Sequence, residues 1–153
     1  MGSHLRINKV TLMLAQFAKA TTNGMLDVMG GGWTQVGPQP SPYFLAGLVE
    51  LPWDAAGIEH TARFDLLDDQ GKPVTNEGPD GEQAPVYAEG QFHVAPAPGT
   101  RRGTPLTVPF AIPIGAMQLP PGRFEWRLEV DGEAHEDWRL GFTVLPLSQS
   151  KAA

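Results

Sequence analysis

The chain has 153 residues, including 18 glycines and 15 prolines, and its formal net charge is −6. Glycine and proline together make up about a fifth of it, against an average of about 12%, which excludes long helices. The hydrophobic fraction of 41% excludes a disordered polar chain. A chain of this length buries roughly two-thirds of its surface on folding, which is enough for one core without staples.

Cysteine is absent, which excludes disulfides, thiol nucleophiles and cysteine-ligated metals. This is compatible with a reducing cytoplasm, where we expect the protein to be located. No apolar run approaches the roughly 18 residues of a membrane span, so we expect no membrane insertion. We also expect no nucleic-acid partner, because the acidic chain has no cluster of basic residues. Its one basic doublet, Arg101-Arg102, lies in a predicted loop that we expect to be solvated.

We expect a single domain over residues 5–146. Residues 1–4, Met-Gly-Ser-His, resemble the remnant of an expression tag, and we leave them out of the fold argument. Residues 147–153 are small and polar, which predicts a flexible C-terminal tail.

Alternation of apolar and polar residues predicts strands along the whole chain. It is clearest over residues 124–130, where the even positions are apolar and the odd positions charged. The alternation resumes after residues 131–133 and runs from Trp138 to Val144, which predicts an antiparallel hairpin with one buried face. The further predicted strands cover residues 9–14, 26–28, 33–36, 43–51, 61–66, 86–94 and 105–114.

Three of these segments carry more specific predictions. Residues 43–51 are apolar at both odd and even positions except at Glu50, so we expect a central strand covered on both faces. Prolines occupy three odd-numbered positions of the last segment, Pro105, Pro109 and Pro113, so the N–H donors that they lack all lie on the same side of the strand. This predicts an edge strand whose free side cannot pair with a further strand. The three glycines at 30–32 predict a sharp bend between two short strands.

The remaining segments predict loops and one helical turn. Residues 70–85 and 95–104 are rich in glycine and proline and are expected to be loops within the domain. Residues 53–57 suggest a short helical turn with Asp54 as its cap. Eight or nine short strands at this spacing predict an all-β fold, namely a single immunoglobulin-like antiparallel β-sandwich with little or no helix.

The sequence shows no motif for nucleophilic or cofactor chemistry. Of the four serines, Ser3, Ser148 and Ser150 lie in the expected tag or tail, and Ser41 stands between two prolines. No Gly-x-Ser-x-Gly elbow is present, and the glycine run is followed by neither a Walker sequence nor a helix. We therefore predict no catalytic residues and no bound cofactor.

Two groups of residues remain weak metal candidates. Residues 131–137 are acidic enough that Asp131, Glu133 and Asp137 could hold Ca²⁺, which prefers clustered oxygen ligands. An exposed hairpin tip with carboxylates has the same sequence, however, and the twelve-residue calcium-loop pattern is absent. His60, His93 and His135 show no paired spacing typical of a metal site, although His93 could be a single ligand.

Several segments resemble a bacterial family of uncharacterised single-domain proteins, a domain of unknown function. The resemblance covers about residues 7–145 and is carried by Lys9–Ala15, Gly24–Leu26 leading into Gly30–Trp33, Leu51–Asp54, Phe64–Asp68 and Leu119–Trp126. It implies no activity, cofactor or site residue. The segment Pro120–Leu128 is also similar to the penultimate strand of many immunoglobulin-like sandwiches, which supports the fold and does not bear on function.

We hypothesise a non-enzymatic binding or assembly module, with a protein partner or self-association. Its expected contact surfaces are the glycine bend, with Trp33 and Trp53 as aromatic anchors, or an unblunted sheet edge opposite the proline strand. Core packing at strand ends is the competing interpretation of both tryptophans. Two alternatives stay open: a metal-dependent or small-molecule enzyme using His93 or residues 131–137, and a carbohydrate-binding module.

Overall fold

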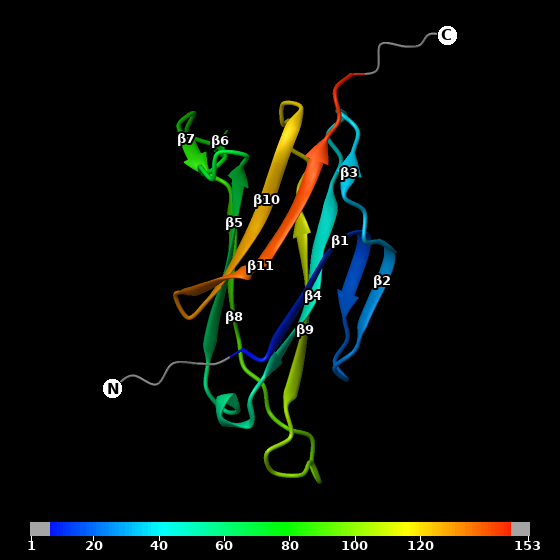
Figure 1. Cartoon of the computed structure of the whole chain (residues 1–153), viewed down its shortest axis with the longest axis vertical. Coiled ribbons are helices and arrows are strands. Elements are labelled where there is room, and N and C mark those ends of the chain that lie inside the picture. Colours follow the sequence, from blue (N-terminus) through cyan, green and yellow to red (C-terminus); the bar gives the residue numbers. More distant parts are fainter. Residues whose placement is uncertain (1–6, 148–153) are drawn as a thin grey trace.

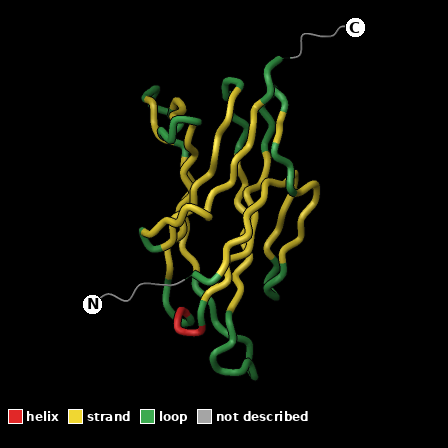
Figure 2. The backbone as a smooth tube through the Cα atoms, viewed as in Figure 1, coloured by secondary structure: helices red, strands yellow, loops and turns green. Residues whose placement is uncertain are grey.

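A computed structural model describes residues 7–147, so the predicted tag at residues 1–4 and all of the predicted tail except Leu147 lie outside the described residues. Within the described range the fold is all β, as predicted, and no helix there is long and apolar enough to cross a membrane (Figure 2). The elements are β1 (Lys9–Ala20), β2 (Leu26–Gly31), β3 (Gln35–Val36), β4 (Tyr43–Leu51), the 3-10 turn η1 (Trp53–Ala55), β5 (His60–Asp68), β6 (Thr75–Glu77), β7 (Gln83–Pro85), β8 (Tyr87–Phe92), β9 (Leu106–Ile114), β10 (Gly122–Val130) and β11 (Glu133–Val144).

The strands form two main sheets. Sheet A has the order β2-β1-β4-β9, and sheet B has the order β3-β11-β10-β5-β8 (Figure 1). Two expectations need correction: residues 7–147 contain eleven strands rather than eight or nine, and β3 pairs parallel with β11. The parallel pair arises because the chain crosses from sheet A to sheet B at the glycine bend and enters alongside the end of β11.

The core lies between the two sheets. Leu14 and Leu45 of sheet A pack in the same cluster as Phe64, Trp126 and Phe142 of sheet B, and none of the five is more than 1% exposed. Each of these residues occupies one of the alternating apolar positions of its strand, so the alternation predicted their burial correctly. Full burial of one such side chain is worth about 1.5–3 kcal/mol, which makes this cluster the main stabilising feature.

Strand β9 is an edge strand, as its prolines predict. It pairs only with β4, with Pro109 opposite Leu48 and Pro113 opposite Phe44. Hydrogen-bonding residues alternate along such a pair, so the missing proline donors lie on the free side and cost the ladder nothing. The edge is therefore closed to a further regular strand.

Strand β1 is longer than the predicted strand at residues 9–14 because it bends and changes partner. Residues 9–15 pair with β4, and residues 15–20 pair with β2 on the other edge (Figure 1). The resulting β1–β2 hairpin packs on the outer face of sheet A, where Ala15, Ala18 and Ala46 are at most 3% exposed. This second apolar layer explains why β4 is apolar on both parities, and the predicted central strand is confirmed.

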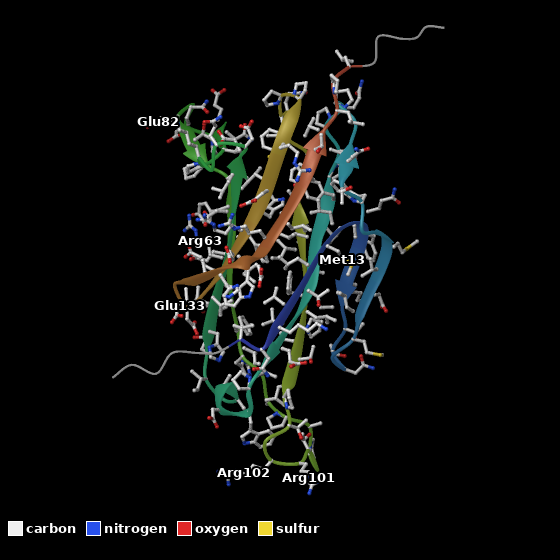
Figure 3. The ribbon with its side chains drawn as sticks, in the orientation of Figure 1. Met13, Arg63, Glu82, Arg101, Arg102 and Glu133 are labelled. Carbon is white, nitrogen blue, oxygen red and sulfur yellow. The ribbon has the colours of Figure 1, made fainter. Side chains whose placement is uncertain are left out.

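The glycine bend leads from β2 in sheet A to β3 in sheet B. Gly30 and Gly32 have φ values of 61° and 90°, a region that favours glycine, and Gly32 N donates to Leu14 O at 2.8 Å. Met13, labelled in Figure 3, lies close beneath the bend, since a Cβ on Gly31 would lie 3.2 Å from its Sδ. The predicted bend between two short strands is thus confirmed.

Three local expectations differ from the structure. The predicted loop at 70–85 contains the exposed hairpin β6–β7, whose three-residue strands are too short to show a periodicity. Asp54 is not a helix cap, because Pro52 holds the N-cap position and no side chain bonds there. Strand β11 begins at Glu133 rather than Trp138, because Asp131 and Gly132 both adopt positive φ and form a two-residue type I′ turn.

Gly47 gives a test of how closely sheet A is packed. A Cβ at this position would lie 2.0 Å from Thr11 O and 2.8 Å from Phe110 Cζ. We expect Gly47→Ala to lower the free energy of unfolding by about 1–3 kcal/mol in urea denaturation, because the neighbouring strand must move. The matched control is Gly90→Ala, where a Cβ would meet nothing within 4 Å. Equal stability of the two variants would contradict the close approach.

Candidate functional site

A cleft of about 570 Å³ opens beside the glycine bend. Its volume falls in the range of about 300–1,000 Å³ that is usual for ligand sites. Its lining combines a glycine-rich backbone, two aromatic rings and small polar side chains: Gln16, Gly30, Gly31, Gly32, Trp33, Gln35, Val36, Gly37, Ser41, Pro42 and Tyr43. We call this site the glycine-bend cleft.

The walls of the cleft come from three parts of the chain. Gln16 stands at the bend of β1, Trp33 follows the glycines, and Tyr43 begins β4. Trp33 packs edge-on against Tyr43 and Phe142, with ring centroids 5.3 and 6.1 Å away. The Trp33 ring is only half buried, so it belongs to the core and also lines the cleft. Trp33 therefore packs partly in the core, and its role as an interaction anchor stays a prediction.

The lining of the cleft is uncharged. The hydroxyl of Tyr43 accepts a hydrogen bond from Trp126 Nε1 at 3.0 Å. Burial raises the pKa of Tyr43 to about 12, although the Trp126 hydrogen bond acts in the opposite direction. Tyr43 consequently stays neutral near pH 7, and the other polar groups in the cleft are the side chains of Gln16, Gln35 and Ser41. This arrangement offers hydrogen bonds and apolar contact to a ligand, and it places no proton donor or acceptor with a pKa near neutrality.

Large apolar side chains are exposed next to the cleft, on the β1–β2 hairpin. Phe17 and Met29 are cross-strand partners and are 44% and 66% exposed, and Met25 near the hairpin tip is 56% exposed. We call these three residues the hairpin surface. Gln16 and Gly30, their neighbours in the chain, line the cleft, but side chains alternate along a strand, so the hairpin surface and the cleft lie on opposite faces of the β1–β2 hairpin. The exposure of Phe17, Met25 and Met29 was not predicted from the sequence, because the predicted first strand ends at residue 14 whereas β1 continues to Ala20.

Trp53 lies apart from Trp33. It is half buried in η1, at the opposite end of the molecule from β3 (Figures 1 and 2). The two predicted anchors therefore do not form one surface, and the cleft contains only Trp33.

Of the acidic residues in and after the β10–β11 turn, Asp131 is held by structural contacts of its carboxylate. Asp131 Oδ1 accepts a hydrogen bond from Thr61 N at 2.9 Å, and its Oδ2 lies 2.8 Å from His60 Nδ1. Asp137 N donates to His135 Nδ1 at 3.1 Å, and Glu133 is the first residue of β11. In residues 7–147 no three His, Asp or Glu side chains converge to form a metal site. The calcium candidate at these residues stays a prediction from the sequence.

His60, which shows no metal-site spacing in the sequence, is a structural residue. It is 3% exposed, its Nε2 donates to Ala55 O at 2.9 Å, and its ring lies against Phe92. Since the neighbours of both ring nitrogens are acceptors, both bonds form when the ring carries two protons. His60 thus joins η1, β5 and the β10–β11 turn. No local pattern could have revealed this, because Asp131 is 71 residues away in the chain.

Asp131 tests whether this turn is structural. We expect Asp131→Ala to lower the free energy of unfolding by about 2–3 kcal/mol. The substitution removes two hydrogen bonds, leaves Nδ1 of the buried His60 without its carboxylate partner, and places alanine at a φ of 52°. Asp131→Asn should cost about 1 kcal/mol, since asparagine tolerates this φ and can still accept from Thr61 N. Urea denaturation measures both. A neutral Asp131→Ala, or Ca²⁺ stabilisation of the wild type that Asp131→Ala abolishes, would favour a metal role instead.

The raised pKa of Tyr43 predicts a pH dependence of stability. Its ordinary value is 10.0, so above about pH 10 the unfolded chain releases the phenolic proton before the folded protein does. The contribution of Tyr43 to the free energy of unfolding is therefore complete below pH 10 and is lost as the pH rises to about 12. We expect the stability advantage of wild type over Tyr43→Phe to shrink by about 1–2 kcal/mol between pH 9 and pH 11.5 in urea denaturation. A constant difference between the two proteins over this pH range would contradict the effect.

Comparison with known proteins agrees with the sequence resemblance. A search of curated proteins finds no match. A family model described as "Family of unknown function (DUF6941)" matches residues 10–143, which is most of the chain. An immunoglobulin-like subtype and a bacterial source stay predictions from the resemblance. Because the match spans nearly all of both sheets and every wall of the glycine-bend cleft, the chain belongs to the family of unknown function DUF6941.

Proposed function

We propose that this protein is a non-enzymatic binding or assembly module that contacts another protein, or a second copy, through the hairpin surface and the glycine-bend cleft. The observation that supports this most is the exposure of Phe17, Met25 and Met29 on one short hairpin. Single exposed apolar side chains are ordinary on protein surfaces, but apolar residues gathered beside a cleft are typical of interaction sites.

The composition of this surface also favours a protein partner. Protein interfaces are enriched in aromatic residues and methionine, and methionine adapts its shape to a partner. The half-buried Trp33 in the adjoining cleft is the kind of anchor that contributes most to binding energy. The outer face of sheet B has a different character: Arg63 is 3.0 Å from Asp65 and Arg139 is 3.6 Å from Glu125, in ion pairs suited to water.

The chemistry of the cleft favours binding over catalysis. Its side chains are neutral amides, a serine and aromatic rings, and the pKa of Tyr43 is too high for proton transfer near pH 7. A cytoplasmic location belongs to the same proposal, since a chain without cysteine suits a reducing compartment.

The test places a photo-crosslinking residue at position 29 in the hairpin surface and, as a matched control, at position 58. Ile58 is 53% exposed, comparable with the hairpin residues, but it lies after η1 and away from the hairpin. We expect a specific crosslink from position 29, either to a second copy or to a partner in extracts of the native cell, and none from position 58. Met29→Lys should abolish the same association in sedimentation velocity while Ile58→Lys preserves it.

Both lysine variants should retain the unfolding free energy of the wild type within about 0.5 kcal/mol, because the substituted side chains are exposed. A strictly monomeric protein without a crosslink from position 29, or equal crosslinking from both positions, would overturn the proposal.

A further inference from the structure

One side of the two-sheet structure is incompletely covered. Strands β8 and β9 end their sheets, and both border this side. The inward-facing residues at the ends of β9, Leu106 and Ile114, are each 7% exposed. Those at its middle, Val108, Phe110 and Ile112, face the same way but are only half buried. Solvent therefore reaches the core between the two edge strands.

A cavity of about 190 Å³ occupies this opening. Its lining is apolar, with Phe64 and Leu128 at the core side and Phe110 and Ile112 on the β9 side. Gly90 of β8 also lines it, and a Cβ there would meet nothing within 4 Å. An enclosed apolar cavity of about 150 Å³ can bind a molecule the size of benzene, so this opening is large enough for one apolar side chain.

The edge beside the cavity, β8, has free backbone groups. Thr61 exchanges hydrogen bonds with Asp131, so its backbone faces the β10 side of β5. Since backbone direction alternates along a strand, Ala62 faces β8 and bonds its partner Gly90. The N–H and C=O groups of Glu89 and Gln91 consequently point to the free edge. In contrast to β9, β8 contains no proline, so a further strand can pair there.

The charges on the outer face indicate what kind of strand fits. Glu129, Arg63 and Glu89 are direct neighbours on β10, β5 and β8. Arg63, labelled in Figure 3, is also bound to Asp65 and lies 4.0 Å over the ring of Tyr87. A basic residue opposite Glu89 would continue the alternation of charge. A second copy of β8 paired about Glu89 would instead oppose two carboxylates, which is unfavourable.

We propose that the free edge of β8 and the adjoining cavity form a binding site for an extended peptide segment of another protein. The segment pairs with the backbone of Glu89 and Gln91, inserts one apolar side chain into the cavity, and places the adjacent basic side chain against Glu89. Strand addition of this kind obtains affinity from backbone hydrogen bonds and specificity from alternate side chains. The site is separate from the hairpin surface and does not depend on it.

The probes are blocked heptapeptides in which lysine alternates with valine, leucine or phenylalanine, with scrambled and glutamate-containing versions as controls. Binding is followed by NMR titration and amide hydrogen exchange of the full chain. We expect at least one alternating lysine peptide to bind, to slow exchange at Glu89 and Gln91, and to shift the methyl signals of Val108 and Ile112. Absence of binding or of protection at these amides, across the whole panel, would overturn the proposal.

Two variants test separately what the cavity and the free edge of β8 contribute to peptide binding. Gly90→Val fills the cavity and should weaken peptide binding at least tenfold while melting no lower than wild type, because its side chain enters open space. Gln91→Pro removes an outward N–H and should weaken binding equally while keeping Gly90 and the apolar side chains that line the cavity. If only Gly90→Val weakens binding, the cavity takes an isolated apolar group and strand addition is wrong. Should Gln91→Pro fail to fold, the exchange pattern of the wild type still decides.

Charge and self-pairing are tested in the same way. Glu89→Lys should weaken the lysine peptides several-fold and favour the glutamate versions, and high salt should reduce both effects. In sedimentation velocity we expect no dimer that forms through the β8 edge. A dimer of that kind would be recognised because Gln91→Pro abolishes it. Such a dimer would mean that a second copy occupies the edge, and an unchanged peptide preference in Glu89→Lys would remove the basic residue from the proposal.

Discussion

Sheet A carries an apolar outer face that has to be removed from water, and the β1–β2 hairpin covers it by folding back. Ala15, Ala18 and Ala46 meet there without exposure, and their small size lets the backbones approach closely. The bend of β1 that this requires exposes Phe17 and brings Gln16 into the wall of the cleft. The candidate interaction surface is therefore a consequence of how the fold hides its second apolar layer.

The glycine bend follows from the same constraint. Once β2 lies over sheet A, the chain must turn abruptly to reach β3 in sheet B, and Gly30 and Gly32 supply the positive φ values for that turn. The turn leaves a hollow beside Trp33, and Gly32 contributes to it because a Cβ there would meet nothing within 4 Å. The turn and the candidate cleft thus depend on the same three glycines, and a larger side chain at Gly31 would clash with Val28.

The two strands bordering the incompletely covered side show how a sheet edge can be closed or left available. Prolines occupy the outward-facing positions of β9 without loss of ladder hydrogen bonds. Strand β8 carries glutamate and glutamine instead, next to a glycine that leaves apolar space unfilled. Natural sheets generally protect their edges, so an edge left unprotected next to an apolar cavity is a place to look for a partner.

The local pattern of the sequence was sufficient for the all-β fold, the buried side chains of the core, the blunted β9 and the glycine bend. Each depends on alternation or on the backbone limits of proline and glycine, which act within a few residues of the chain. The hairpin β6–β7 was missed because its three-residue strands show no such alternation.

Only the tertiary structure decided which surfaces are available. Whether Trp33 is buried or Met29 exposed depends on where the β1–β2 hairpin folds, and the contact between His60 and Asp131 joins residues 71 positions apart. The cavity between β8 and β9 likewise comes from two strands that never pair. Periodicity determines which face of a strand is apolar, but the packing of the sheets determines which apolar faces remain uncovered.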